Sequence, residues 1–313
     1  MSSTESAPRS GTAFLVVGES VADVVRTAGR PDVVHPGGSP ANVAYGLARL
    51  GHAPTLLTQL GDDPLGATIR ARLTGAGVAL PAPGGPAVRT PSAVVTLDAA
   101  GRAGYVFDIV WTLPPRVALP GPRPGHLHIG SIAATMEPGA AGVRELVERL
   151  RPTATVSYDI NVRPQLLGGQ AESVTRVERC AARCDIVKAS EEDVDWLYPG
   201  RSPDEVADGW LARGAGLALI TLGERGAFAR TRTERVTVPA GRTVVADTVG
   251  AGDAFMSGTL DALAHAGALS RDRLRSLSRA ELCTVVSHAT AAAGLTVSRP
   301  GAALPTRAEL GLP

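Results

Sequence analysis

The chain has 313 residues, and 44% of them are hydrophobic, which is enough to build the core of one large α/β domain. Its formal net charge of +1 gives no electrostatic reason to expect a nucleic acid or a membrane surface as partner. Three cysteines are too few for a disulfide framework, so we expect reduced thiols and a cytoplasmic protein.

The first segment, residues 1–12, contains Ser, Pro and Thr but no apolar centre. It predicts a disordered tail rather than a signal peptide. We expect residues 13–313 to form a single domain. No apolar run approaches the roughly 20 residues of a membrane-spanning helix.

Short apolar runs alternate with helical patterns along this domain, and such alternation predicts an α/β fold with a mostly parallel sheet covered on both faces. Helical patterns include residues 140–150 and 172–184. Two stretches, roughly 21–36 and 90–112, break the alternation and are typical of hairpins. The predicted sheet strands are 14–17, 55–57, 127–129, 154–157, 186–187 and 217–221.

A helix is predicted directly after Gly37 and Gly38. Ser39 can cap it, Pro40 suits its first turn, and apolar residues then recur at helical spacing. Asn42 falls in the first turn, where its amide can donate to and accept from a polyol. The alternative is an ordinary packed helix in which Asn42 is merely exposed.

The most informative stretch is 247–255, in which Gly250 and Gly252 flank Ala251 and precede Asp253 at a predicted helix start. Unpaired N–H groups and the positive dipole end suit a phosphate, and an acid at its rim can take a proton from a hydroxyl. This pattern predicts phosphoryl transfer to an alcohol. The alternative is a tight turn whose acid complements the helix dipole. The chain has no P-loop motif, and no Gly-x-Gly-x-x-Gly follows its first strand.

Together the two glycine-containing motifs resemble those of the ribokinase-like carbohydrate kinases, the PfkB family. The resemblance implies a three-layer fold with a mostly parallel central sheet and a small β lid built from residues 21–36 and 90–112. The segments 159–164 and 188–192 look most like the fructokinase and 2-keto-3-deoxygluconate kinase branch. Further segments in family order are 18–23, 59–66, 159–164, 188–192, 221–226 and 299–302.

The resemblance also implies roles for individual residues. Asp253 would be the general base, and the backbone of Gly250, Ala251 and Gly252 would form an anion hole for the transferred group. Trp111 and two further aromatic residues fall in the expected lid. The implied sugar-binding residues are Asp23, Gly38, Asn42, Tyr105, Phe107 and Arg163.

Nucleotide and metal sites follow from the same resemblance. ATP is expected with Mg²⁺, whose water shell would be organised by Glu192 or Asp193. A monovalent cation such as K⁺ is expected near Asp247 and Val249. Lys188, the only lysine of the chain, would approach the phosphates as a point charge. The implied nucleotide-binding residues are Asn161, Lys188, Thr221, Gly223, Gly226 and His288.

The sequence thus predicts an ATP-dependent kinase of a small sugar, most similar to a fructokinase. A 2-keto-3-deoxygluconate kinase, a nucleoside kinase and a catalytically inactive sugar-binding protein are the alternatives. The lid implies a homodimer by resemblance only, since lid strands often pair between subunits in this family.

Overall fold

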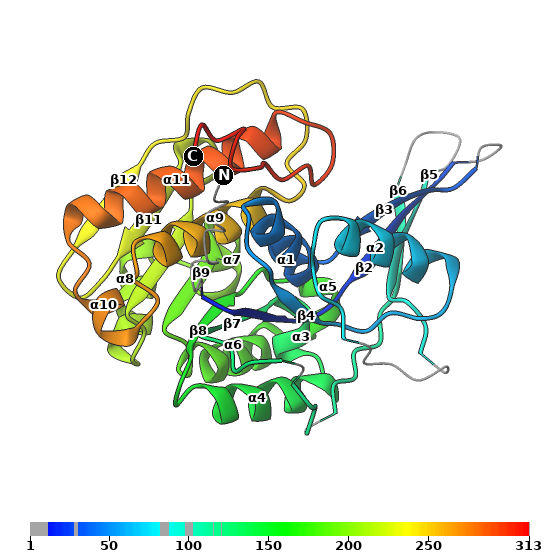
Figure 1. Ribbon diagram of the computed structural model, residues 1–313, viewed down its shortest axis with the longest axis horizontal. Coiled ribbons are helices and arrows are strands. Elements are labelled where there is room, and N and C mark those ends of the chain that lie inside the picture. Colours follow the sequence, from blue (N-terminus) through cyan, green and yellow to red (C-terminus); the bar gives the residue numbers. More distant parts are fainter. Residues whose placement is uncertain are drawn as a thin grey trace, which may run out of the picture.

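The computed structural model describes residues 12–27, 31–81, 88–97, 103–114, 116–119 and 121–312. All but the last residue of the predicted tail lie outside these ranges. Within them the chain forms a mixed α/β fold with a large sheet and a separate small sheet, which confirms the predicted fold class (Figure 1).

The large sheet has the strand order β12-β11-β10-β9-β8-β7-β1-β4. Its strands from β4 to β10 run parallel, whereas β11 and β12 are antiparallel additions at one edge that the sequence analysis did not predict. The strands are β1 (Phe14–Val17), β4 (Thr55–Leu57), β7 (His126–Gly130), β8 (Thr155–Asp159), β9 (Ile186–Ser190), β10 (Leu217–Thr221), β11 (Ala227–Arg230) and β12 (Arg235–Val238).

Helices cover both faces of this sheet because its strands are apolar on both sides. In β1, Leu15 and Val17 enter one core cluster, while Phe14 and Val16 enter the other. The first face carries α3 (Ser131–Thr135), α4 (Gly139–Leu150), α5 (Pro164–Leu167), α6 (Gln170–Ala181), α7 (Glu191–Leu197) and α8 (Pro203–Ala212). The second carries α1 (Ser39–Arg49), α2 (Pro64–Gly75), α9 (Ala251–His265), α10 (Arg271–Arg275) and α11 (Arg279–Val297).

The small sheet projects from one end of the body, as Figure 1 shows. It consists of two antiparallel hairpins, β2 (Val21–Thr27) with β3 (Val33–Gly37) and β5 (Ser92–Leu97) with β6 (Ala103–Asp108). Strands β2 and β5 join the hairpins by parallel pairing. Both stretches that broke the predicted alternation therefore form one sheet.

Trp111 was expected in this small sheet, and that expectation is wrong. Strand β6 ends at Asp108, and Trp111 lies in the core of the body with 1% of its surface exposed. Its indole N–H donates to the carbonyl of Ala133 at 3.1 Å. Burying this large ring needs a partner for its N–H, and the start of α3 supplies one.

The C-terminal helix α11 corrects the expectation that no apolar run approaches the length of a membrane-spanning helix. In the part of the chain that the structure describes, α11 has the length and composition of a membrane-spanning helix. It packs against α9 and the edge strands β11 and β12, and Leu282, Val285 and Val286 are buried. An apolar helix that covers a sheet passes the same test, and α11 is a helix of this kind.

Candidate active site

A cavity of about 370 Å³ lies where the small sheet meets the carboxyl ends of the parallel strands. We call it the lid cavity. Its wall combines residues from β2, α1, β6, the segment after β8 and the start of α9. The polar and charged residues among them are Glu19, Asp23, Ser39, Asn42, Ser131, Asn161, Arg163, Lys188, Thr248 and Asp253.

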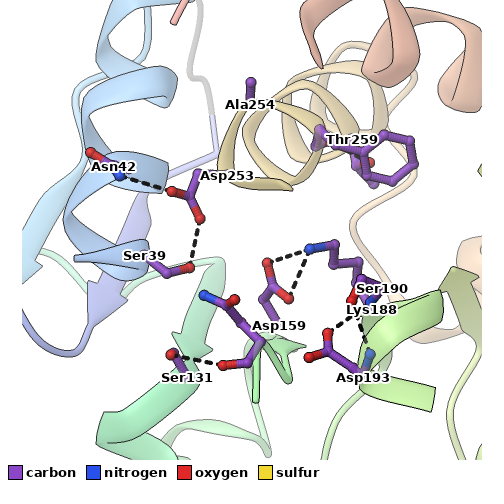
Figure 2. Close-up of polar contacts among 12 residues, drawn as sticks. Ser39, Asn42, Ser131, Asp159, Lys188, Ser190, Asp193, Asp253, Ala254 and Thr259 are labelled. Atoms are coloured by element: carbon purple, nitrogen blue, oxygen red, sulfur yellow. Dashed lines mark hydrogen bonds and ion pairs between the residues drawn. The ribbon is translucent and has the colours of Figure 1, made fainter. Parts of the chain in front are cut away.

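Asp253 lies in the first turn of α9 with 8% of its surface exposed. Its two carboxylate oxygens accept hydrogen bonds from Ser39 Oγ at 2.7 Å and from Asn42 Nδ2 at 2.8 Å (Figure 2). Both donors come from the first turn of α1, so two helix N-termini meet at this carboxylate. Ser39 was expected to cap α1, but Gly38 is the N-cap and the Ser39 hydroxyl instead holds Asp253.

Two glycines before α1 make room for this arrangement. A Cβ atom on Gly37 would lie 2.3 Å from Oδ2 of Asp23, so only glycine lets that carboxylate lie over the loop. Gly38 has a φ of 94° and would place a Cβ 2.6 Å from the carbonyl oxygen of Glu19. Burial raises the pKa of Asp23, although the nearby charges of His35 and Arg163 oppose the rise.

Glycines at the start of α9 are constrained in a similar way. Gly250 caps the helix in the left-handed conformation, with a φ of 79°, and a Cβ there would lie 2.8 Å from Ala302. A Cβ on Gly252 would lie 2.9 Å from Nζ of Lys188. The N–H of Ala251 contacts the Thr248 carbonyl at 3.3 Å, so this amide is partly engaged inside its own turn.

Beneath this turn lies a buried ion pair. Nζ of Lys188 lies 3.0 and 2.9 Å from the two carboxylate oxygens of Asp159, and both side chains are almost fully buried (Figure 2). Burial alone would lower the pKa of Lys188, but the charges of Asp159 and Asp193 raise it above its ordinary value. The lysine therefore remains a fixed ammonium next to the glycine turn.

Glu19 is a site residue to which sequence reasoning assigned no role. It follows β1, lines the lid cavity and is 1% exposed, and its Oε2 accepts the N–H of Ala133 at 3.0 Å. Burial raises its pKa to about 7, although hydrogen bonds and the charge of Arg163 lower it in part. The signals in the sequence were its position two residues after the first strand and its place in the family-like segment 18–23.

The segment after β8 brings two more predicted residues to the lid cavity. Arg163 donates from Nη1 to Oδ1 of Asn161 at 2.6 Å and to the carbonyl of Val162 at 2.9 Å. Asn161 has a φ of 41°, and Ser131 donates to its carbonyl oxygen at 3.2 Å. Asn161 and Lys188, both predicted near the nucleotide phosphates, line the lid cavity together with Gly250 and Gly252, and their contact with phosphate stays a prediction.

A second cavity, of about 530 Å³, lies on the other side of the glycine turn between β10, the loop before α9, and α11. We call it the α11 cavity. Thr221, Gly223 and Gly226, which were predicted to contact the nucleotide, line it together. Its wall is mostly small or apolar, and it shares Thr248 and Gly252 with the lid cavity.

The structure distinguishes the surroundings of Glu192 and Asp193, the two acids between which sequence reasoning could not choose. Both oxygens of Asp193 are engaged, accepting the backbone N–H groups of Val162 at 2.7 Å and Ser190 at 2.8 Å. Glu192 instead lines the α11 cavity. Asp193 therefore fixes the start of α7 by a capping box with Ser190, whereas Glu192 is exposed.

Asp247 and Val249 lie in the loop that leads into α9. Oδ1 of Asp247 accepts the N–H of Val249 at 3.0 Å, and Oδ2 accepts the N–H of Gly301 at 2.8 Å. These hydrogen bonds lower the pKa of Asp247 and tie the loop to the C-terminal segment. A monovalent cation beside this loop stays a prediction.

One expected contact falls elsewhere, and another lies outside the described residues. Sequence reasoning put His288 beside the nucleotide, but its Nε2 lies 2.9 Å from Oδ2 of Asp261, and it does not line the α11 cavity. The residues of α11 that line the cavity are Thr290, Ala293, Gly294 and Val297. The side chain of Tyr105 lies outside the described part of the chain, whereas Phe107 lines the lid cavity.

The arrangement has a clear chemical capacity. A helix N-terminus with a fixed ammonium beneath it can hold an anionic group at the boundary of the two cavities. A carboxylate oriented by two donors can accept a proton from a hydroxyl in the lid cavity. One cavity therefore suits a polyhydroxy ligand, and the other suits a larger and less polar group.

Comparison with known proteins agrees with this geometry. The model of the pfkB family carbohydrate kinases matches residues 13–108 and 126–309. A fructokinase of Rhizobium leguminosarum bv. trifolii is 34% identical over 79% of this chain and 77% of its own. Fructokinase-1 of Oryza sativa subsp. japonica is 32% identical over 88% of this chain and 87% of its own.

Solved structures give the same result. A fructokinase double mutant of Vibrio cholerae O395, bound to fructose, ADP and a potassium ion, has a TM-score of 0.82 at 28% identity and covers 97% of this chain and 99% of its own. Aminoimidazole riboside kinase of Salmonella enterica has a TM-score of 0.77 at 27% identity and covers 96% of this chain and 98% of its own. The chain therefore belongs to the PfkB family of carbohydrate kinases.

Proposed function

We propose that this kinase transfers the γ-phosphoryl group of ATP to a hydroxyl of a small neutral sugar, with fructose as the first candidate. The observation that carries the proposal is the position of Asp253. It lines the lid cavity at the N-terminus of α9, next to Gly252, which lines both cavities. Both of its oxygens are oriented by donors from α1.

In the proposed reaction, the sugar lies in the lid cavity against Asp23, Gly38 and Asn42. The attacking hydroxyl gives its proton to Asp253 as its oxygen forms the new bond to the γ-phosphorus, and the bond between that phosphorus and the β,γ-bridging oxygen breaks to release ADP. Phosphoryl transfer depends chiefly on positioning and charge stabilisation, so a carboxylate is an adequate base here.

Charge on the transferred group would be held by backbone N–H groups of Gly250 and Gly252 and by the ammonium of Lys188. Ala251 contributes less, because its N–H already contacts the Thr248 carbonyl. The base and ribose of ATP would occupy the α11 cavity, with Thr221, Gly223 and Gly226 at its wall.

The residues present also fit a magnesium ion that arrives with ATP. Mg²⁺ prefers oxygen ligands and keeps several waters, and it would neutralise charge on the phosphates. Glu192 lines the α11 cavity, whereas both oxygens of Asp193 accept backbone N–H groups. Glu192 is therefore the acid that we propose for the magnesium water shell. We keep K⁺ near Asp247 and Val249 as part of the proposal.

The charges of the lid cavity favour a neutral sugar over an acid. Three carboxyl groups line it, those of Glu19, Asp23 and Asp253. Of the two cations at its described wall, Lys188 is paired with Asp159, and Arg163 donates to Asn161 and Val162. A substrate carboxylate would have to compete for Arg163 and would face three acids.

A coupled assay of ADP release tests this proposal. Purified enzyme with Mg-ATP is supplied with fructose, glucose, ribose, 2-keto-3-deoxygluconate or a nucleoside. The proposal expects the largest kcat/KM for fructose. A preference for 2-keto-3-deoxygluconate, with Arg163→Ala harming the acid far more than fructose, would instead establish the acid kinase. Sugar binding with no ADP release would identify a catalytically inactive sugar-binding protein.

We further propose that the small sheet pairs with that of a second copy and so forms a homodimer. Apolar side chains on and beside it are exposed, including Val33, Val106, Phe107 and Val110. Light scattering after size exclusion should give twice the chain mass, and Val106→Glu should give the monomer. A monomer in the unaltered protein excludes this assembly. We also propose that residues 13–313 act as one cytoplasmic catalytic domain, in keeping with three unbridged cysteines.

A further inference from the structure

A cluster of imidazoles surrounds one buried carboxylate outside both cavities. We call it the Asp261 cluster, and it consists of His52, Asp261, His265, His288 and Arg307. Three of the six histidines of the chain are therefore gathered on one aspartate whose side chain is 1% exposed. His52 follows α1, Asp261 and His265 belong to α9, and His288 belongs to α11.

The distances in this cluster are close to those of a metal site. Oδ1 of Asp261 lies 2.8 Å from Nε2 of His52 and 3.1 Å from Nδ1 of His265. The three ligand atoms all lie within 4.8 Å of one another. Around a tetrahedral zinc ion with bonds of about 2.0–2.2 Å, neighbouring ligand atoms are separated by roughly 3.3 Å. His265 Nδ1 also lies 2.9 Å from the backbone carbonyl oxygen of Asp261. It would have to give up that contact, and side-chain adjustments would then bring all three atoms into this geometry.

His288 lies at the same carboxylate. Its buried Nε2 lies 2.9 Å from Oδ2 of Asp261, so both carboxylate oxygens have an imidazole beside them. His288 is therefore close enough to contact a water on an ion bound at Oδ1.

We propose that His52, Asp261 and His265 bind one divalent transition metal ion, with Zn²⁺ as the best match. Two imidazoles and one carboxylate are typical zinc ligands, and a water completes the fourth position beside His288. This ion would join the segment directly after α1 to α9, and α1 and α9 are the helices that carry Asn42 and Asp253. The site lies outside the nucleotide and sugar cavities, so the inference does not depend on the proposed reaction.

Arg307 gives a way to distinguish a metal site from an ion-pair network, because its guanidinium would compete with a metal ion for Asp261. Its Nη1 lies 3.2 Å from Oδ1 of Asp261, where it supplies positive charge in the metal-free protein. Binding of a divalent ion must displace this guanidinium or act against its charge. Arg307→Gln should therefore tighten metal binding, whereas a cluster that serves only as an ion-pair network would be weakened.

The test uses untagged full-length protein, treated with a chelator and free of nucleotide and sugar. It is titrated with Co²⁺, whose visible absorption bands report tetrahedral ligation. The proposal expects one Co²⁺ per chain, displaced by Zn²⁺. His265→Gln should bind at least about a hundredfold more weakly, since loss of supporting residues alone costs about 10- to 100-fold. The His265 side chain is 49% exposed, so this variant should fold.

Matched controls decide the outcome. Cys283→Ser removes a partly accessible thiol outside the cluster and should leave the titration unchanged. Zn²⁺ should raise the melting temperature of the unaltered protein but not that of His265→Gln. Absence of the cobalt bands, equal affinity in His265→Gln, or loss of binding in Cys283→Ser would each overturn the proposal.

Discussion

The lid cavity and the α11 cavity share Thr248 and Gly252 but are built by different means. The first gathers buried charge, including Asp253, Glu19 and the pair of Lys188 with Asp159. The second is walled mainly by glycines, threonines and small apolar side chains. The difference shows that one side of this site acts through fixed side-chain charges, while the other acts through backbone and shape.

The largest test of the charged side removes its ammonium. Lys188→Met leaves the carboxylate of Asp159 buried without a partner, which should cost about 3–5 kcal/mol of stability. We expect kcat to fall by about a thousandfold, comparable to loss of one preorganised charge-stabilising group. Urea unfolding and steady-state kinetics measure the two effects.

A double variant separates the two effects of this lysine. Lys188→Met with Asp159→Leu removes both charges and should recover much of the stability while kcat stays low. Recovery of activity in the double variant would mean that Lys188 only neutralises Asp159, and the proposed contact with the phosphates would be wrong.

A variant of Glu19 tests whether burial in the lid cavity raises the pKa of this carboxyl group. Its pKa rises from 4.5 to about 7 in the folded chain, so the unfolded chain releases this proton first. The contribution of Glu19 to the free energy of unfolding is fully present below pH 4.5. It declines as pH rises to 7, by at most about 3 kcal/mol. Glu19→Gln should remove this decline in urea unfolding measured at pH 5 and pH 8. An unchanged pH dependence would show that Glu19 ionises normally.

The glycine turn at Gly252, which lines both cavities, gives a test with an expected effect of intermediate size. A Cβ on Gly252 would lie 2.9 Å from Nζ of Lys188 and must displace it. Gly252→Ala should lower kcat by about 10- to 100-fold, because small misplacements of catalytic groups are costly. The matched control is Gly75→Ala at the end of α2, where a Cβ meets no atom within 4 Å. Equal kinetics in both variants would show that the position of Lys188 beside Gly252 does not affect catalysis.

The smallest effect is expected on the α11 side. Gly294→Val places two methyl groups in the α11 cavity from α11 and should raise the KM for ATP by about tenfold, with the KM for the sugar unchanged. Thr284→Val introduces the same side chain at an exposed position of the same helix and serves as control. A raised KM for the sugar instead would mean that the two cavities are assigned wrongly.

The same contrast explains what could be predicted from sequence. Local signals placed the strands, the glycine turn before α9 and the helix after Gly38, because each depends on a few neighbouring residues. Side-chain partners depend on elements far apart in the chain. The hydrogen bond from Ser39 to Asp253 joins residues 214 positions apart, and no local pattern indicated it.

His288 and Glu192 are two residues whose surroundings could not be predicted from the local sequence. The helical pattern located His288 on α11 but not the face of that helix, and the structure turns it toward Asp261. Glu192 and Asp193 were equivalent in sequence, and only the backbone N–H groups around Asp193 distinguish them. The edge strands β11 and β12 were missed because they lie outside the strand–helix alternation.

The central claim is that Asp253 deprotonates the sugar hydroxyl at the boundary of the two cavities. Kinetics of Asp253→Asn, with fructose and ATP binding measured separately by calorimetry, test it most directly. The account predicts that kcat falls by at least about a thousandfold while both ligands still bind, since the amide keeps the shape but not the basicity. A kcat within tenfold of the unaltered enzyme would contradict it.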